Sequence, residues 1–157
     1  MSQAENKLLE SLDIALNNKL VVPFINEAIS NVTIELTKSN FTSITKNISI
    51  DKFNGLLPNQ IKLCRIFALK ANIKSKVERH TNSPQRTFTY IGEGDTKILE
   101  NNIWKSNVKK NVGSSIDDRW LSVPENTWHQ PIALSNDWIT ITFHTASEDE
   151  IIDEYRD

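Results

Sequence analysis

The stretch Val123-Pro124-Glu125-Asn126-Thr127-Trp128-His129-Gln130-Pro131 places a tryptophan and a histidine between two prolines. Proline and asparagine favour turn conformations, so Pro124 to Asn126 predicts a tight turn directly before His129. Three roles are open for His129 at this point: a metal ligand, a general base, or a structural ring in a turn. The segments around this stretch decide what kind of fold would hold it.

Most of the chain around the turn predicts short strands. Alternating apolar and polar residues, rich in β-branched types, occur at residues 32–36, 61–69, 86–91, 96–99, 120–123 and 137–145. Turn-forming pairs such as Asn54-Gly55 and the run Gly92-Glu93-Gly94-Asp95 separate them. Several short strands at regular spacing favour a closed β-barrel or a sandwich over a parallel sheet.

Helical patterns are expected only at the two ends of the chain. Leucines and isoleucines recur at the helical period between residues 8 and 16, and Pro23 opens a second short helical pattern. Three acidic residues precede Ile151-Ile152 near the C-terminus, as in a charged first helical turn. We therefore expect one domain, with a helical segment at 1–30, a barrel at 31–146 and a helical tail at 147–157 packed on the barrel.

The composition excludes several classes of protein. The 157 residues suffice for one hydrophobic core, and a formal net charge of -2 gives no global positive field for nucleic acid or an anionic membrane. No apolar run reaches the roughly 20 residues of a membrane helix, and the polar N-terminus is unlike a secretory signal. A cytoplasmic protein is expected. The single cysteine, Cys64, lies in an apolar run and is expected to be a buried core thiol.

Three histidines are candidate ligands: His80, His129 and His144. Neutral imidazole is the commonest side-chain ligand of transition metals, and ligands distant in sequence can converge inside a barrel. None of the three has a local ligand spacing, so each also suits a hydrogen-bonded structural role. His144 shares one face of its expected strand with Trp138, Thr140 and Thr142, and either face of that strand could line the barrel interior.

The sequence resembles the cupin superfamily at two motifs. Residues 124–129 resemble the second motif, P-x-G-x-x-H, with Asn126 in place of the glycine. Asn126 suits that place because asparagine tolerates the left-handed backbone conformation. His80, Asn82, Thr87 and Gly94 match the spacing of the first motif, H-x-H-x4-E-x6-G, with its second histidine and its glutamate replaced. The resemblance covers about half the chain, and its first motif is degenerate.

The resemblance implies an all-β fold: a cupin-like double-stranded β-helix, or jelly-roll barrel, with a short helical N-terminal extension. It also implies a homodimer and a small-molecule ligand. The family's metal site would retain His80 and His129, with His144 as a third candidate, for a divalent transition metal such as Fe, Mn, Ni or Zn. Two imidazoles without a carboxylate hold such an ion weakly.

A polar cluster near the first motif offers a second kind of site. Arg79, Asn82, Gln85 and Arg86 carry guanidinium and amide groups, which suit carboxylates, phosphates or sugar hydroxyls. Trp128 is a candidate stacking wall for a ligand. The alternative is that the arginines face solvent and the tryptophan packs in a core or a dimer contact.

Two function classes follow, and a purely structural module is a third. The first is a small-molecule binding barrel of unknown substrate with a degenerate metal site. The alternative is a metal-dependent cupin enzyme, of isomerase or dioxygenase type, using His80 and His129. The sequence has no nucleophile elbow, Walker loop or complete dinucleotide fingerprint.

Overall fold

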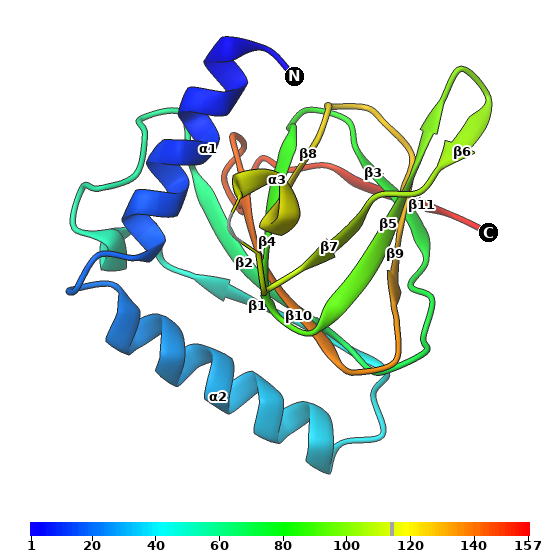
Figure 1. Ribbon diagram of the computed structural model, residues 1–157, viewed down its shortest axis with the longest axis horizontal. Helices are drawn as coiled ribbons and strands as arrows, with labels where there is room; N and C mark the ends of the chain where they lie inside the picture. The colour runs from blue at the N-terminus through cyan, green and yellow to red at the C-terminus, as the bar shows by residue number, and fades with distance from the viewer. Residues whose placement is uncertain (114) are drawn as a thin grey trace.

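The computed structural model describes residues 1–113 and 115–157 and contains two helices packed on a two-sheet β-barrel (Figure 1). The helical elements are α1 (Gln3–Leu16), α2 (Val22–Lys38), the 3-10 helix η1 (Ile50–Phe53) and the short α3 (Ile116–Arg119). The strands are β1 (Ser43–Ile48), β2 (Leu63–Leu69), β3 (Val77–His80), β4 (Gln85–Ile91), β5 (Glu93–Glu100), β6 (Ile103–Lys105), β7 (Val108–Lys110), β8 (Trp120–Val123), β9 (His129–Ala133), β10 (Trp138–His144) and β11 (Asp153–Arg156).

The strands form two antiparallel sheets that face each other. One sheet has the order β1-β2-β10-β4-β8, and the other has the order β11-β3-β9-β5-β6, with β7 also paired to β5. Apart from β1–β2 and β5–β6, neighbours in each sheet are not consecutive in sequence, as in a jelly roll, where strands alternate between the two sheets. The β-rich barrel expected from the strand spacing is confirmed. No helix among the described residues combines the length and apolarity that crossing a membrane requires.

The two N-terminal helices cover the outer face of the first sheet (Figure 1). Each helix presents one apolar stripe: Leu9, Leu12 and Leu16 on α1, and Ile25, Ile29, Val32 and Leu36 on α2. Ser2 caps α1 by accepting a hydrogen bond from the Glu5 amide. The helix stripes and the outward side chains of the sheet form one buried core.

The strand expected at residues 32–36 is wrong, because these residues lie in α2. Val32 and Leu36 are spaced by four and continue the buried stripe of Ile25 and Ile29. Burial of that continuous stripe outweighs the β-propensity of the local Val-Thr-Ile run. The helical segment therefore extends to Lys38 rather than ending at residue 30.

The helical tail expected at residues 147–157 is also wrong. One turn forms, in which the Ile151 amide donates to the Ser147 carbonyl, and the chain then continues as β11. β11 pairs antiparallel with β3, with Asp153 opposite His80 and Arg156 opposite Val77. Pairing with the open edge at β3 satisfies backbone groups along one side of residues 153–156, and an isolated helix this short is only marginally stable.

The two faces of β10 contact different parts of the protein, and one of them lines the barrel interior. Ile139, Ile141 and Phe143 join the core under the helices, whereas Trp138, Thr140, Thr142 and His144 face the space between the sheets. Because both faces are covered, every residue of this strand is buried. Cys64 on the neighbouring strand is fully buried in the same core, as expected, and burial raises the pKa of its thiol.

Candidate functional site

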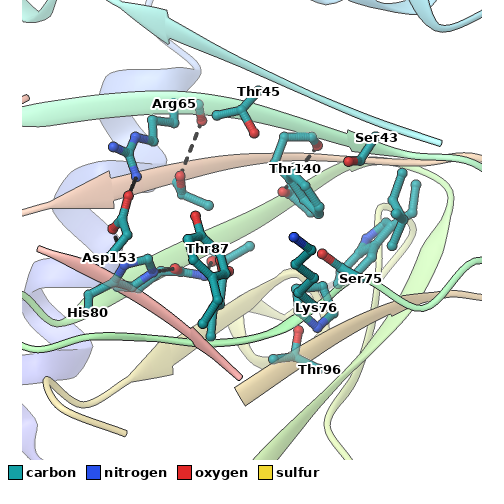
Figure 2. A pocket seen from close by; sticks show the side chains of 18 of the residues that line it. Ser43, Thr45, Arg65, Ser75, Lys76, His80, Thr87, Thr96, Thr140 and Asp153 are labelled. Atoms are coloured by element: carbon teal, nitrogen blue, oxygen red, sulfur yellow. Dashed lines mark hydrogen bonds and ion pairs between the residues drawn. The ribbon is translucent and has the colours of Figure 1, made fainter. Parts of the chain in front are cut away.

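A cavity of about 660 Å³ lies between the two sheets. This volume is within the range of small-molecule sites. Eight of its lining residues are serines or threonines: Thr42, Ser43, Thr45, Ser75, Thr87, Thr96, Thr140 and Thr142. Figure 2 shows Arg65, Asp153 and His80 together at one end of this space, with Ser43, Ser75 and Thr96 toward the other. The cavity therefore has hydroxyls along its walls and the ion pair of Arg65 and Asp153 at one end.

Three metal-ligating side chains converge at the charged end. Side chains two residues apart on a strand share a face, so β3 directs Glu78 and His80 to the interior. β9 begins at His129, which is the direct antiparallel partner of Glu78. One potential ligand atom from each of Glu78, His80 and His129 lies within 4.8 Å of the others. We call these three residues the Glu-His-His cluster.

The turn that was expected before His129 orients its ring. Asn126 has the left-handed backbone conformation predicted for it, with φ of 57°, and its amide donates to the His80 carbonyl at 2.7 Å. The Nδ1 atom of His129 lies 3.0 Å from the Thr127 carbonyl oxygen. A carbonyl only accepts hydrogen bonds, so Nδ1 carries the proton and the Nε2 lone pair of the neutral ring points the other way.

That lone pair faces a carboxylate. Nε2 of His129 is fully buried, lies 3.4 Å from Oε1 of Glu78, and has no hydrogen-bond partner among the described residues. Two electron-rich atoms at this distance in a buried place repel each other unless a positive charge lies between them. Either a second proton on His129 or a bound cation satisfies this requirement.

His80 is held from both sides. Its Nδ1 lies 2.7 Å from Oδ1 of Asp153 on β11, and its Nε2 lies 2.7 Å from Oε1 of Gln85 on β4. Gln85 in turn donates to the hydroxyl of Thr87 at 2.8 Å. The hydrogen bond from His80, aided by the Arg65 guanidinium at 3.3 Å, lowers the pKa of Asp153 and keeps it ionised. Asp153 therefore accepts a hydrogen bond from Nδ1–H of His80 and fixes the orientation of the ring.

His144 lies beside His80 but outside the Glu-His-His cluster. The ring centroids of His80 and His144 are 4.7 Å apart, in an edge-to-face arrangement. Burial first, and then the charge of His80 and Arg65, lower the pKa of His144 well below its ordinary value, so this ring is neutral. His144 lines the cavity between β2 and β4, on the inner face of β10.

Of the five predicted ligand-binding residues, Gln85 is the one that lines the cavity. Arg79 bonds to Glu154 at 2.7 Å and stacks on the Trp128 ring at 4.5 Å, on the outer face of its sheet. Arg86 pairs with Glu5 on α1. Asn82 is exposed and bonds to the backbone of Glu150 and Ile152. Alternation along each strand explains this placement, because Arg79 and Arg86 each stand between two inward residues.

Sequence reasoning missed Glu78, Arg65 and Asp153. For Glu78 a signal existed: it precedes His80 by two residues on a strand, so both side chains had to share a face. No local signal marked Asp153, because it meets His80 through a strand pairing that spans 73 residues. Arg65 lies in the strand predicted at residues 61–69, but no site role was predicted for it.

One pair of the Glu-His-His cluster has the spacing of two ligands on a divalent transition metal. Two ligands bound about 2.1 Å from one ion and separated by 90–109° lie roughly 3.0–3.4 Å apart. The distance from Nε2 of His129 to Oε1 of Glu78, 3.4 Å, falls in this range, and the carbonyl oxygen of Gln85 offers a further ligand beside His80. Two imidazoles and one carboxylate suit Fe, Mn, Ni or Zn, and the carboxylate missing from the sequence prediction is supplied by Glu78.

Comparisons with known proteins find structural similarity without detectable sequence similarity. No protein-family model matches the sequence, and no curated protein matches it. An oxalate oxidase in complex with the substrate analogue glycolate has a TM-score of 0.56 and 12% identity over 74% of this chain and 57% of its own. Pumpkin seed globulin has a TM-score of 0.58 and 13% identity over 74% of this chain and 29% of its own.

An oxalate decarboxylase from Lactobacillus farciminis, in a formate complex, has a TM-score of 0.56 and 9% identity over 73% of this chain and 32% of its own. The chain thus spans less than two thirds of the length of each of these proteins. At such low identity the likeness concerns the fold alone. It agrees with the two-sheet topology described above: the chain has the cupin fold, an all-β jelly-roll barrel with a helical N-terminal extension.

Proposed function

We propose that this protein is a small-molecule binding barrel whose cavity carries a divalent transition-metal ion on the Glu-His-His cluster. The observation that carries the proposal is the buried contact between Nε2 of His129 and Oε1 of Glu78, which a bound cation would satisfy in place of a second proton on His129. Glu78 and His80 also line the cavity, so an ion held there would be accessible to a ligand. The ion would supply Lewis acidity toward an oxygen atom of that ligand.

A second register of the first cupin motif points to the same residues as metal ligands. The cupin spacing H-x-H-x4-E-x6-G is also met two residues earlier than His80, as Glu78-x-His80-x4-Gln85-x6-Gly92. In this register Glu78 and His80 stand at the two histidine positions, and Gln85 stands at the glutamate position. In this register the carboxylate ligand stands at the first named position of the motif rather than the third. Asn82 and Thr87 then have no role as metal ligands.

The protein residues have separable tasks in this proposal. Glu78 and His129 face each other across the ion position, and Asp153 holds the His80 ring by its Nδ1 proton. The hydroxyls of the cavity wall would bind polar groups of the ligand and orient it. Arg65 keeps Asp153 ionised and adds positive charge at this end of the cavity.

A metal-dependent enzyme of isomerase or dioxygenase type is the second candidate. The observation that favours it is the position of Glu78 and His80 in the cavity lining, which would place a ligand beside the ion. A binding barrel and an enzyme share this geometry. Turnover of a ligand found to bind would distinguish them, since the fold hosts unrelated functions.

Metal content of the protein, purified without a histidine tag and analysed by mass spectrometry, tests the proposal. Near-stoichiometric Fe, Mn, Ni or Zn is expected in the wild-type chain. The ion should be lost in Glu78→Gln and in the double variant His80→Ala, His129→Ala. Glu154→Gln is the matched control, because Glu154 lies on the adjacent strand and pairs with Arg79 on the outer face.

Circular dichroism shows whether each variant keeps its fold. Absence of metal from wild-type protein after supplementation with each ion would refute the metal site. Loss of metal from Glu154→Gln as well would attribute the effect to general damage rather than to the cluster. The homodimer expected from the resemblance stays a prediction, which light scattering of the purified protein checks.

A further inference from the structure

The interior of the barrel changes from polar to apolar along the strands. The registers of β1, β2 and β10 stack their inward side chains in rows. Asn47, Arg65 and Thr142 form one row, Thr45, Phe67 and Thr140 form the next, and Ser43, Leu69 and Trp138 form the third. The first row adjoins His144 and Gln85, and hence the Glu-His-His cluster. The third row lies at the opposite end.

The third row belongs to a separate apolar cluster. Leu69, Ala133 and Trp138 are buried together, and Phe67 and Ile73 pack against them while still partly exposed. Both Phe67 and Ile73 line the cavity. Half-exposed apolar side chains inside a cavity gain free energy when a ligand removes them from water, so this end favours an apolar group.

The polar end offers a cationic hydrogen-bond donor to an anion, because Nε of Arg65 is buried and has no hydrogen-bond partner among the described residues. The lining as a whole has an excess of positive charge: it contains Arg65, Lys74 and Lys76, besides Lys46, which pairs with Glu35 on α2, against the two carboxylates Glu78 and Asp153. A divalent ion on the Glu-His-His cluster would add to this excess. An anion with oxygen atoms complements this positive charge. The hydroxyls of Thr87 and Thr142 also line the cavity and can form hydrogen bonds with it.

We propose that the ligand of the cavity is an amphipathic monocarboxylate, with its carboxylate at the Arg65–Thr142 row and an apolar or aromatic tail against Phe67, Ile73 and Leu69. This inference rests on the proposed function, because it specifies the class of small molecule for the same cavity. The rows are two to four residues apart along β2, so head and tail are about 7–13 Å apart. Phenylalkanoates of short chain length have this reach.

Calorimetric titration of the full chain with three probes tests the inference. 4-Phenylbutanoate carries both groups, butanoate lacks the ring, and 4-phenylbutan-1-ol lacks the charge. We expect 4-phenylbutanoate to bind at least about tenfold more tightly than either of the other two. Ile73→Asn should remove the advantage of the ring and leave butanoate unaffected. Arg65→Met should weaken the binding of both carboxylates and leave the binding of the alcohol unaffected.

Matched controls are Ile103→Asn and Lys7→Met, which alter exposed side chains outside the cavity lining. Equal affinity for 4-phenylbutanoate and butanoate overturns the apolar end, and equal affinity for the acid and the alcohol overturns the anionic head. Failure of all three probes to bind, or an unchanged ring advantage in Ile73→Asn, overturns the whole inference.

Each titration is run on chelator-treated protein and again after addition of Mn²⁺, which separates this inference from the metal site. If 4-phenylbutanoate still binds more tightly than butanoate in the absence of metal, the inference stands even where the metal-content experiment fails. A metal-loaded protein that shows no ring advantage overturns the inference and leaves the proposed metal site standing.

Discussion

Replacing Glu5 with glutamine tests whether one ion pair fixes α1 on the barrel. The Glu5 carboxylate accepts hydrogen bonds from Nε of Arg86 at 2.8 Å, from Nη2 of Arg86 at 2.9 Å and from the Ser122 hydroxyl at 2.6 Å. The side chains of Glu5 and Arg86 are 20% and 11% exposed. The pair is therefore bidentate and mostly removed from water.

The expected loss follows from that burial. Removing one partner of a fully buried ion pair costs about 3–5 kcal/mol, and an exposed pair contributes about 0–1 kcal/mol. Nη1 of Arg86 already has no partner within the described part of the chain, so the variant would leave a mostly buried guanidinium without its anion. We expect Glu5→Gln to lower the free energy of unfolding by about 2–3 kcal/mol, and Tm by about 6–9 °C for a chain this long.

The loss of stability in Glu5→Gln should depend on pH, in a direction that follows from the pKa of Glu5. The hydrogen bonds from Arg86, which outweigh the opposing effect of burial, lower the pKa of Glu5 below its ordinary 4.5 in the folded protein. A depressed folded pKa stabilises the protein above the unfolded pKa, and this stabilisation is lost as the pH falls through the folded pKa. The difference between wild type and Glu5→Gln should be full near neutral pH and shrink once the solution is more acidic than 4.5.

Urea denaturation followed by tryptophan fluorescence at several pH values measures this difference. Glu10→Gln, an exposed carboxylate on the same helix, is the control and should change stability by less than about 0.5 kcal/mol. A loss in Glu5→Gln no larger than that of the control would show that the pair does not hold the helix. A loss of the same size at acidic and neutral pH would refute the electrostatic origin.

Three further perturbations test other parts of the structure. Asp153→Asn removes the anion that accepts the Nδ1 proton of His80, and should weaken metal affinity by about 10–100-fold in a competition titration while the fold persists. Asn126→Ala should lower the free energy of unfolding by about 1–2 kcal/mol because its φ is positive, and Asn126→Gly should restore it; equal stability of the two variants would contradict this reason. Leu12→Ala in the fully buried stripe of α1 should cost about 2–5 kcal/mol by urea denaturation, and a loss below 1 kcal/mol would mean that α1 is not packed as described.

Local sequence signals predicted the barrel and part of the site. The turn before His129 was predicted together with the left-handed conformation of Asn126, because both depend on residues adjacent in the chain. The proximity of His80 and His129 came from two spaced motifs. The Asp153 contact depends on β11 pairing with β3, and no local pattern encodes which strands meet across more than 70 residues.

The differences between the sequence predictions and the structure have physical causes, which particular residues illustrate. Val32 to Leu36 alternates like a strand, but the spacing of Ile25, Ile29, Val32 and Leu36 also fits a helix, and the longer stripe buries more apolar surface. Arg79 and Arg86 were expected at a ligand because of their chemistry alone. Their strands turn them outward, where each finds a carboxylate on another element.

The two walls of the cavity differ in how they are covered, and this has a consequence for motion. α1 and α2 bury the back of the sheet that contains β2, β10 and β4, whereas the outer face of the other sheet exposes Trp104 and Arg156 to solvent. Amide hydrogens exchange slowly where a strand is buried on both faces and faster where it is covered on one. The β11–β3 side should therefore exchange its amide hydrogens faster than the threonine-bearing wall, and it is the wall expected to move when a ligand enters the cavity.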